Sequence, residues 1–174
     1  MVRRTHKGDH MSKADEMTAA LGGATTPDDT SRPLYGASFG QAIARFFKRY
    51  VQFHGRSSRS EFWWVQLMFF VVGLIFSALS ASWYPEVLNA MLTGDPAQIA
   101  AATALIPGWY TTLTTIWGLA TIIPSLALIW RRLHDSNLAG PWFFLIFVPV
   151  AGALALLVFM LRDSRPEGRR FDRA

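Results

Sequence analysis

Three long stretches without a charged residue or a histidine dominate the pattern of hydrophobic and polar positions. They cover residues 62–83, 109–130 and 142–161, and they are 22, 22 and 20 residues long. At a rise of about 1.5 Å per residue, an α-helix of this length reaches about 30 Å, the thickness of the hydrocarbon core of a bilayer. The pattern therefore predicts an all-α integral membrane protein, a small bundle of about three transmembrane helices.

A basic amphipathic helix is predicted shortly before the first stretch, because apolar residues recur there at helical spacing and the basic residues fall largely on the other side. The apolar positions are Phe39, Ile43, Phe46, Phe47 and Tyr50, and the basic positions are Arg45, Lys48 and Arg49. Next to a membrane span, such a helix is suited to lie in the headgroup layer. We favour this N-terminal interfacial helix over the alternative, a helix packed on other parts of the same protein.

Composition divides the chain into three parts. Residues 1–35 are polar and without periodicity, which predicts a disordered N-terminal tail. Residues 36–161 form the membrane domain, and residues 162–174 form a basic C-terminal tail. Between the first two spans, Asp95 stands before a proline and is expected to cap a short helix, and Pro124 is expected to kink the second span.

Two local patterns mark the first span. Ser58 and Glu61 have the spacing of a capping box, so we interpret Glu61 as a helix cap rather than a catalyst. Gly73, Ser77 and Ala81 recur every four residues and form a small-residue stripe, which predicts a face where another helix packs closely. Small residues are, however, common in any span.

The distribution of positive charge predicts the topology. Lys and Arg number ten in residues 1–61, none in 84–108, two in 131–141 and five in 162–174. The positive-inside rule therefore places the N-terminus in the cytoplasm and the long connection outside. Three crossings would put the arginine-rich tail outside, whereas a re-entrant hairpin bent at Pro149–Gly152 would return it inside. We favour three crossings, because non-helical backbone at membrane depth needs protein or water around it.

Two sequence blocks resemble hallmarks of a known family. Residues 53–63 read Phe-His-Gly-Arg-Ser-Ser-Arg-Ser-Glu-Phe-Trp, and residues 131–135 read Arg-Arg-Leu-His-Asp. In this order they are similar to the YhaH-like family of small bacterial inner-membrane proteins, a domain of unknown function, over roughly residues 39–172. The chain departs from it in its N-terminal tail, in the longer connection between the first two spans, and in residues 169–172. The resemblance implies a multi-pass protein of the bacterial inner membrane and says nothing firm about activity.

One group of residues is a candidate site for an anionic ligand, since arginines grip phosphate or carboxylate through forked hydrogen bonds. The group is Arg56, Arg59, Arg131, Arg132, His134 and Asp135. The alternative is that the arginines only anchor the spans to headgroups and that the carboxylate neutralises one of them. Anchoring explains the arginines well, but it explains His134 and Asp135 poorly.

Our leading hypothesis is a non-enzymatic membrane protein that binds anionic lipid, a membrane partner or another copy of itself. It would bind through the four arginines of the candidate site, Arg56, Arg59, Arg131 and Arg132, which form an arginine face, and through the small-residue stripe. The alternative is a membrane enzyme or carrier for an anionic lipid-like substrate, in which the arginines hold the substrate and His134 and Asp135 move a proton.

Other function classes find little support in the sequence. The net charge of +5 suggests lipid rather than nucleic acid, because Lys and Arg cluster beside the spans. No nucleophile elbow or zinc-site spacing is present, and the spans lack the ionisable groups that ion-coupled transport needs. We therefore expect no cofactor, no metal and no nucleic-acid partner.

Overall fold

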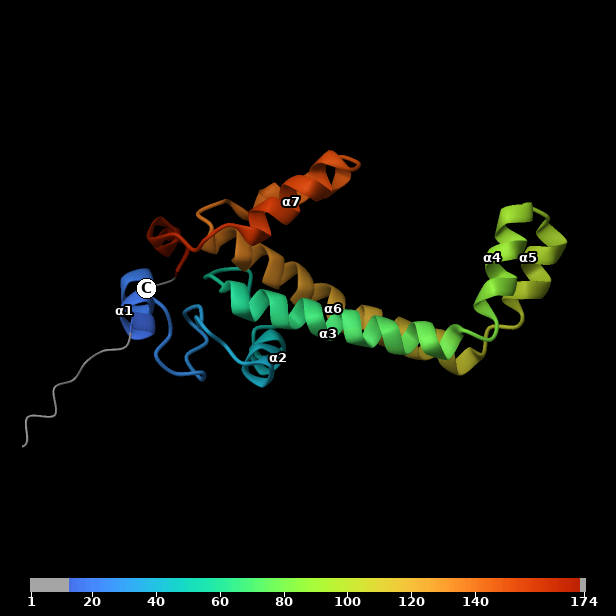
Figure 1. The fold of residues 1–174 in the computed structure, drawn as a ribbon, viewed down its shortest axis with the longest axis horizontal. Helices are drawn as coiled ribbons and strands as arrows, with labels where there is room; N and C mark the ends of the chain where they lie inside the picture. Colours follow the sequence, from blue (N-terminus) through green and yellow to red (C-terminus); the bar gives the residue numbers. More distant parts are fainter. Residues whose placement is uncertain (1–12, 173–174) are drawn as a thin grey trace, which may run out of the picture.

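The computed structural model describes residues 13–172, which form helices joined by turns and loops, with no strand among them (Figure 1). In chain order the helices are α1 (Lys13–Leu21), α2 (Phe39–Lys48), α3 (Arg59–Ser80), α4 (Tyr84–Thr93), α5 (Pro96–Thr103), α6 (Gly108–Asp135), the 3-10 helix η1 (Gly140–Phe147), α7 (Ala151–Leu161) and the 3-10 helix η2 (Pro166–Phe171). The all-helical architecture expected from the sequence is confirmed.

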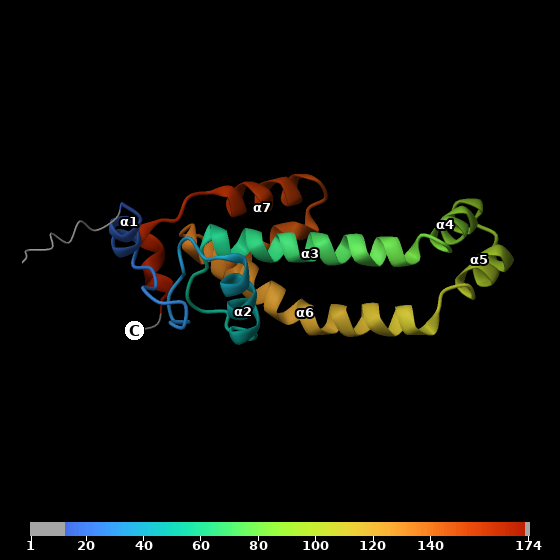
Figure 2. The same ribbon diagram turned by 60° about the horizontal axis from the view of Figure 1, so that its bottom comes forward.

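A long antiparallel pair of helices, α3 and α6, forms the axis of the molecule (Figure 2). In the described part of the chain, these two helices are long and apolar enough to cross a membrane. Many of their apolar side chains are exposed, for example Phe70 and Leu119. Exposure of this kind fits helices whose outer faces contact lipid rather than water.

The connection between the two spans folds into a small helical hairpin of its own. Helices α4 and α5 pack against each other through Val87, Ala90 and Ala102. The carboxylate of Asp95 accepts a hydrogen bond from the Ala97 amide at 2.9 Å, which confirms the predicted cap of α5. This hairpin lies at the opposite end of the long pair from both described termini (Figure 1).

The third apolar segment does not form the continuous span that we favoured. It breaks after η1 and returns as α7, which has 11 residues and packs against η1. Pro149 has no amide hydrogen to continue the helix, and a Cβ on Gly152 would lie 1.7 Å from the Leu145 carbonyl oxygen, so only glycine permits this close return. The guanidinium of Arg132 donates to the Met160 carbonyl at 3.1–3.2 Å and ties the end of the hairpin back to α6. The structure therefore has the hairpin form of this segment.

The N-terminal region also differs from its prediction. Arg45 of α2 is buried and donates to the carbonyl oxygens of Pro27 and Asp29, at 2.9 and 2.7 Å. The loop before α2 is thus held against that helix, and from residue 13 onward the chain differs from the disordered tail that we predicted. The rest of that tail, residues 1–12, lies outside the described part. Helix α2 itself packs on α3, so its arginine side chains are not all directed at headgroups, and its position in the headgroup layer stays a prediction.

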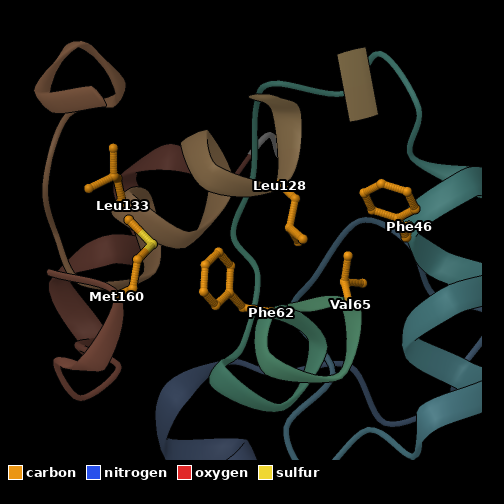
Figure 3. Packing of buried hydrophobic residues seen from close by; sticks show 6 residues of the cluster. All are labelled: Phe46, Phe62, Val65, Leu128, Leu133 and Met160. Atoms are coloured by element: carbon orange, nitrogen blue, oxygen red, sulfur yellow. The ribbon is translucent and has the colours of Figure 1, made fainter. Parts of the chain in front are cut away.

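The main hydrophobic core lies where α2, α3, α6 and α7 meet (Figure 3). These helices come together at the end of the long pair that is nearer the described termini (Figure 1). It contains Phe46 from α2, Phe62 and Val65 from α3, Leu128 and Leu133 from α6, and Met160 from α7. The same core holds α2, the two long helices and the returning hairpin together, and it underlies the candidate site.

A tyrosine beyond α2 compensates for the proline inside α6. Pro124 has no amide hydrogen, so the carbonyl of Ala120, four residues earlier, loses its helical donor. The Tyr50 hydroxyl donates to this carbonyl oxygen at 2.8 Å. Prolines are tolerated in apolar spans when a neighbour satisfies the freed carbonyl in this way.

Tyr50→Phe removes this hydroxyl and leaves the Ala120 carbonyl without a donor. We expect the free energy of unfolding in detergent micelles to fall by about 1–3 kcal/mol. The matched control is Tyr110→Phe, because the Tyr110 hydroxyl donates at 3.3 Å to Phe76, a carbonyl inside the regular helix α3. Equal losses in the two variants would contradict the role given to Tyr50.

Candidate functional site

The structure gathers five of the six predicted site residues at one end of the molecule, around the main core. Arg56 comes from the segment before α3, and the other four come from the last turns of α6, namely Arg131, Arg132, His134 and Asp135. All five are buried, with at most 7% of the surface of any of them exposed. Arg59 lies apart and is half exposed, at 2.8 Å from Asp163.

Asp135 is at the centre of a buried polar network. Its carboxylate lies 2.7 Å from Arg132 Nη1 and 3.6 Å from Arg56 Nη1. The Tyr35 hydroxyl donates to it at 2.9 Å, and the Ser164 hydroxyl donates to it as well. Burial and the nearby Asp135 charge raise the pKa of Tyr35, so the phenol stays protonated as this bond requires. Both carboxylate oxygens therefore accept hydrogen bonds from groups of the chain itself.

Asp172 completes the network from the C-terminal segment, because its carboxylate lies 2.7 Å from Arg56 Nη2. The two arginines of this network are matched by two carboxylates, and the charges balance. Backbone contacts join the same segments, since the Gly55 amide donates to the Phe171 carbonyl at 2.9 Å. A Cβ on Gly168 would lie 2.5 Å from the His134 carbonyl oxygen, which shows how closely η2 packs on α6.

The His134 side chain contacts two other segments of the chain. Its ring stacks on Phe171 with the ring centroids 4.0 Å apart, and Nδ1 lies 3.0 Å from the Gly55 carbonyl oxygen. A carbonyl only accepts, so Nδ1 carries the proton. The histidine that the sequence suggested for proton transfer thus helps to hold the C-terminal segment.

A second cluster surrounds Glu61. The predicted capping box is present, because Glu61 Oε2 accepts from the Ser58 amide at 2.8 Å and Ser58 Oγ accepts from the Glu61 amide at 3.2 Å. The same carboxylate also pairs with Arg45 and lies 3.9 Å from Arg49 Nη1. Burial lowers the pKa of Arg49 to about 10, although the Glu61 charge acts in the opposite direction, so Arg49 remains charged at neutral pH.

Sequence reasoning missed several members of these clusters, namely Tyr35, Arg45, Arg49, Ser164 and Asp172. Only the helical spacing of Arg45 and Arg49 gave a signal, since residues four apart share one helix face. We took that face as lipid-directed, whereas it turns toward Glu61. The contacts of Tyr35 and Asp172 join parts of the chain that are far apart in sequence and leave no local pattern.

A groove at the start of α3 contains the exposed member of the predicted set. Its lining residues are Arg59, Ser60, Trp63, Trp64, Leu67 and Leu161. The walls are mostly apolar, and the Arg59 guanidinium is the one charged group among them. The groove is therefore amphipathic, with indole and leucine side chains beside a cation that is half exposed.

The residues of the predicted packing stripe lie on the surface of the structure. Gly73, Ser77 and Ala81 are all exposed, and a Cβ on Gly73 would meet no atom within 4 Å. The structure thus leaves the stripe open on the outer surface of α3.

Comparison with known proteins places the chain in a family. The family described as "Protein of unknown function (DUF805)" matches residues 50–173. The chain belongs to the DUF805 family. "Inner membrane protein YhaI" of Escherichia coli (strain K12) is 33% identical over 124 residues, which cover 71% of this chain and 86% of that protein. "Inner membrane protein YhaH" of the same strain is 32% identical over 127 residues, which cover 73% and 89%. No solved structure gives a significant match.

Membership in DUF805 confirms the resemblance seen in the sequence and makes this chain a relative of inner-membrane proteins of unknown function. Within the described residues of this DUF805 member, no group of three or more His, Cys, Asp or Glu side chains is placed to hold a metal ion. Of the pair considered for proton transfer, Asp135 accepts from Arg132, Tyr35 and Ser164, and His134 contacts the Gly55 carbonyl through Nδ1.

Asp135→Asn removes the charge that neutralises Arg56 and Arg132 inside the DUF805 network. Breaking a buried ion pair leaves an uncompensated charge, so we expect the free energy of unfolding in micelles to fall by about 3–5 kcal/mol. The control is Asp163→Asn, which breaks an exposed pair and should cost less than about 1 kcal/mol. A loss at Asp135 no larger than at Asp163 would show that the network is not a structural centre.

Proposed function

We propose that this DUF805 member is a non-enzymatic inner-membrane protein that binds an anionic lipid in the groove at the start of α3. The observation that carries this proposal is the position of Arg59, half exposed at an apolar groove lined by two tryptophans. An arginine grips a phosphate through its planar fork. Tryptophans are enriched where a span meets the headgroups, so the groove lies at the depth of a lipid phosphate.

Of the arginines that the sequence suggested as ligands for an anion, this proposal keeps only Arg59 as the lipid ligand. Arg56 and Arg132 are buried and paired with carboxylates of the chain, and Arg131 is buried against backbone carbonyls. These three arginines are better suited to hold the protein together than to receive a lipid from the membrane. The enzyme alternative needs an accessible acid or base, and the burial of His134 and Asp135 argues against it.

The proposed topology has two crossings, α3 and α6, with both chain ends in the cytoplasm. Ten Lys and Arg precede residue 62, none lies in 84–108, and five follow residue 161. With η1 and α7 folded back as a hairpin, all the basic segments fall on one side, as the positive-inside rule favours. The hairpin removes the conflict that three crossings would create.

A second candidate function is association with a partner helix or with another copy of the chain. It is supported by the open stripe of Gly73, Ser77 and Ala81, which would let a helix approach closely within the membrane. Gly73→Leu should then abolish an oligomer seen by native mass spectrometry, while the neighbouring Leu74→Ile should leave it unchanged. If the wild-type protein is monomeric in this measurement, self-association is excluded as a function.

Arg59→Gln should weaken retention of phosphatidylglycerol about tenfold, because it removes one charge-assisted contact to the phosphate. The measurement is native mass spectrometry of protein extracted gently from membranes that contain this lipid. Asp163→Asn is the matched control, since it also breaks the Arg59–Asp163 pair but keeps the arginine. Equal retention by the wild type and Arg59→Gln would exclude this groove as the lipid site.

Reporter fusions test the two-crossing topology. A reporter enzyme that is active only outside the cytoplasm should be inactive when fused after Ala174 and active when inserted at Gly94, between α4 and α5. A reporter that works only in the cytoplasm should give the reverse pattern. External activity after Ala174 would instead support three crossings.

A further inference from the structure

The cluster around Glu61 carries more positive than negative charge. Arg45, Arg49 and Arg131 converge there, and each has at most 2% of its surface exposed. Glu61 accepts from Arg45 and lies 3.9 Å from Arg49. Arg131 instead donates to the carbonyl oxygens of Arg49 and Gln52, and no carboxylate of the described residues lies within ion-pair distance of it. Three buried cations therefore share one carboxylate.

This excess is specific to the Glu61 cluster. The neighbouring network places Arg56 and Arg132 beside Asp135 and Asp172, so its charges balance. Burying a charge without a counter-charge is costly, and proteins usually pair buried ions or bind a compensating ion. Two polar atoms of the unbalanced cluster, Arg49 Nη2 and Arg131 Nε, are also buried without a hydrogen-bond partner. The cluster thus lacks both negative charge and hydrogen-bond acceptors for its guanidinium groups.

A groove of about 460 Å³, whose exposed lining is more apolar than polar but includes several polar side chains, lies over this cluster, between the end of α2 and the loop that precedes α2. It is lined by Thr30, Ser31, Lys48, Arg49, Tyr50, Val51, Gln52 and His54. Arg49 joins the two features, because it lines the groove and also belongs to the cluster. Its Nη2 lies beside Gly55, 3.1 Å from the place where a Cβ would stand, and Gln52 Nε2 lies 3.7 Å from the same place.

We propose that this groove binds a phosphate group, which neutralises the excess charge of the arginine cluster. Lys48, whose side chain is 57% exposed, contributes the cation at the rim, and Arg49 contributes the cation below. The Gln52 amide, which has only a long 3.5 Å contact with the Thr30 carbonyl, is a donor suited to phosphate oxygens, and the Ser31 hydroxyl would turn from Asp29 to donate as well. The phosphate is either free in solution or part of a lipid headgroup. The groove shares no residue with the Arg59 groove, so this site is separate from the proposed lipid site.

Lys48 is the residue to change, because it is exposed and its loss should not unfold the protein. It also lies 3.2 Å from Asp28, which is itself 90% exposed. Lys48→Gln removes both the charge and this pair, whereas Asp28→Asn removes only the pair. The two variants therefore separate the loss of a phosphate ligand from the loss of a surface ion pair.

The experiment uses the full chain in dodecyl maltoside micelles, which contain no phosphate, at constant ionic strength. All proteins carry Arg59→Gln, so that the result does not depend on the proposed lipid groove. The thermal unfolding midpoint is followed by tryptophan fluorescence while inorganic phosphate is added in one arm and phosphatidylglycerol in the other. We expect saturable stabilisation in at least one arm, with an affinity about tenfold weaker for Lys48→Gln and unchanged or tighter for Asp28→Asn.

The two titrations distinguish the two possible sources of the phosphate. Stabilisation by inorganic phosphate with this dependence on Lys48 identifies a free phosphate as the ligand, and stabilisation by phosphatidylglycerol alone identifies the headgroup. The proposal is overturned if neither probe stabilises the protein. It is also overturned if Lys48→Gln binds as tightly as its parent, or if Asp28→Asn weakens binding as much as Lys48→Gln does.

Discussion

The ion pairs of Asp135 with Arg56 and Arg132 connect parts of the chain that are far apart in sequence, and they do so beside the hydrophobic core. One arginine precedes α3, the other ends α6, and the same carboxylate accepts from Tyr35 in the N-terminal loop and from Ser164 after α7. A charge enclosed in this way must keep its partners, because each unpaired buried ion would cost several kcal/mol (about 3–5 in measured cases). The network therefore helps to fix the start of α3 and the end of α6 relative to the loop around Tyr35 and the segment from Ser164 to Asp172.

The same network supports the point where the third apolar segment turns back on itself between η1 and α7. A returning hairpin exposes backbone carbonyls at its end, and those carbonyls need donors. Arg132 donates to Met160 and Arg162 while it pairs with Asp135, so one guanidinium supports both the hairpin and the ion network. The Arg-Arg-Leu-His-Asp block thus connects α6 to the hairpin, the core and the C-terminal segment, with Leu133 in the core and His134 stacked on Phe171.

Local features of the fold could be predicted from the sequence, and features formed by distant contacts could not. The cap of α3, the cap of α5 and the two long apolar helices each depend on residues close together in the chain. Hydropathy gives the length of an apolar run but does not show whether the run forms one continuous helix. It therefore could not predict the break between η1 and α7. The structure brings five of the six predicted site residues together, but their contacts with Tyr35 and Asp172, which lie far from them in sequence, could not be predicted.

Charge balance separates the structural arginines from those available for a ligand. In the Asp135 network every arginine has a carboxylate, so an added anion would have to displace a partner that is already well placed. In the Glu61 cluster the carboxylate is shared, and Arg131 depends on carbonyl dipoles, which offset a full charge only in part. An anion bound there would therefore supply the missing negative charge without displacing Glu61, and only the exposed contacts of Lys48 with Asp28 and of Ser31 with Asp29 would open. The sequence analysis placed Arg56, Arg131 and Arg132 in one candidate site, because a sequence shows where arginines occur but not which of them the fold has already neutralised.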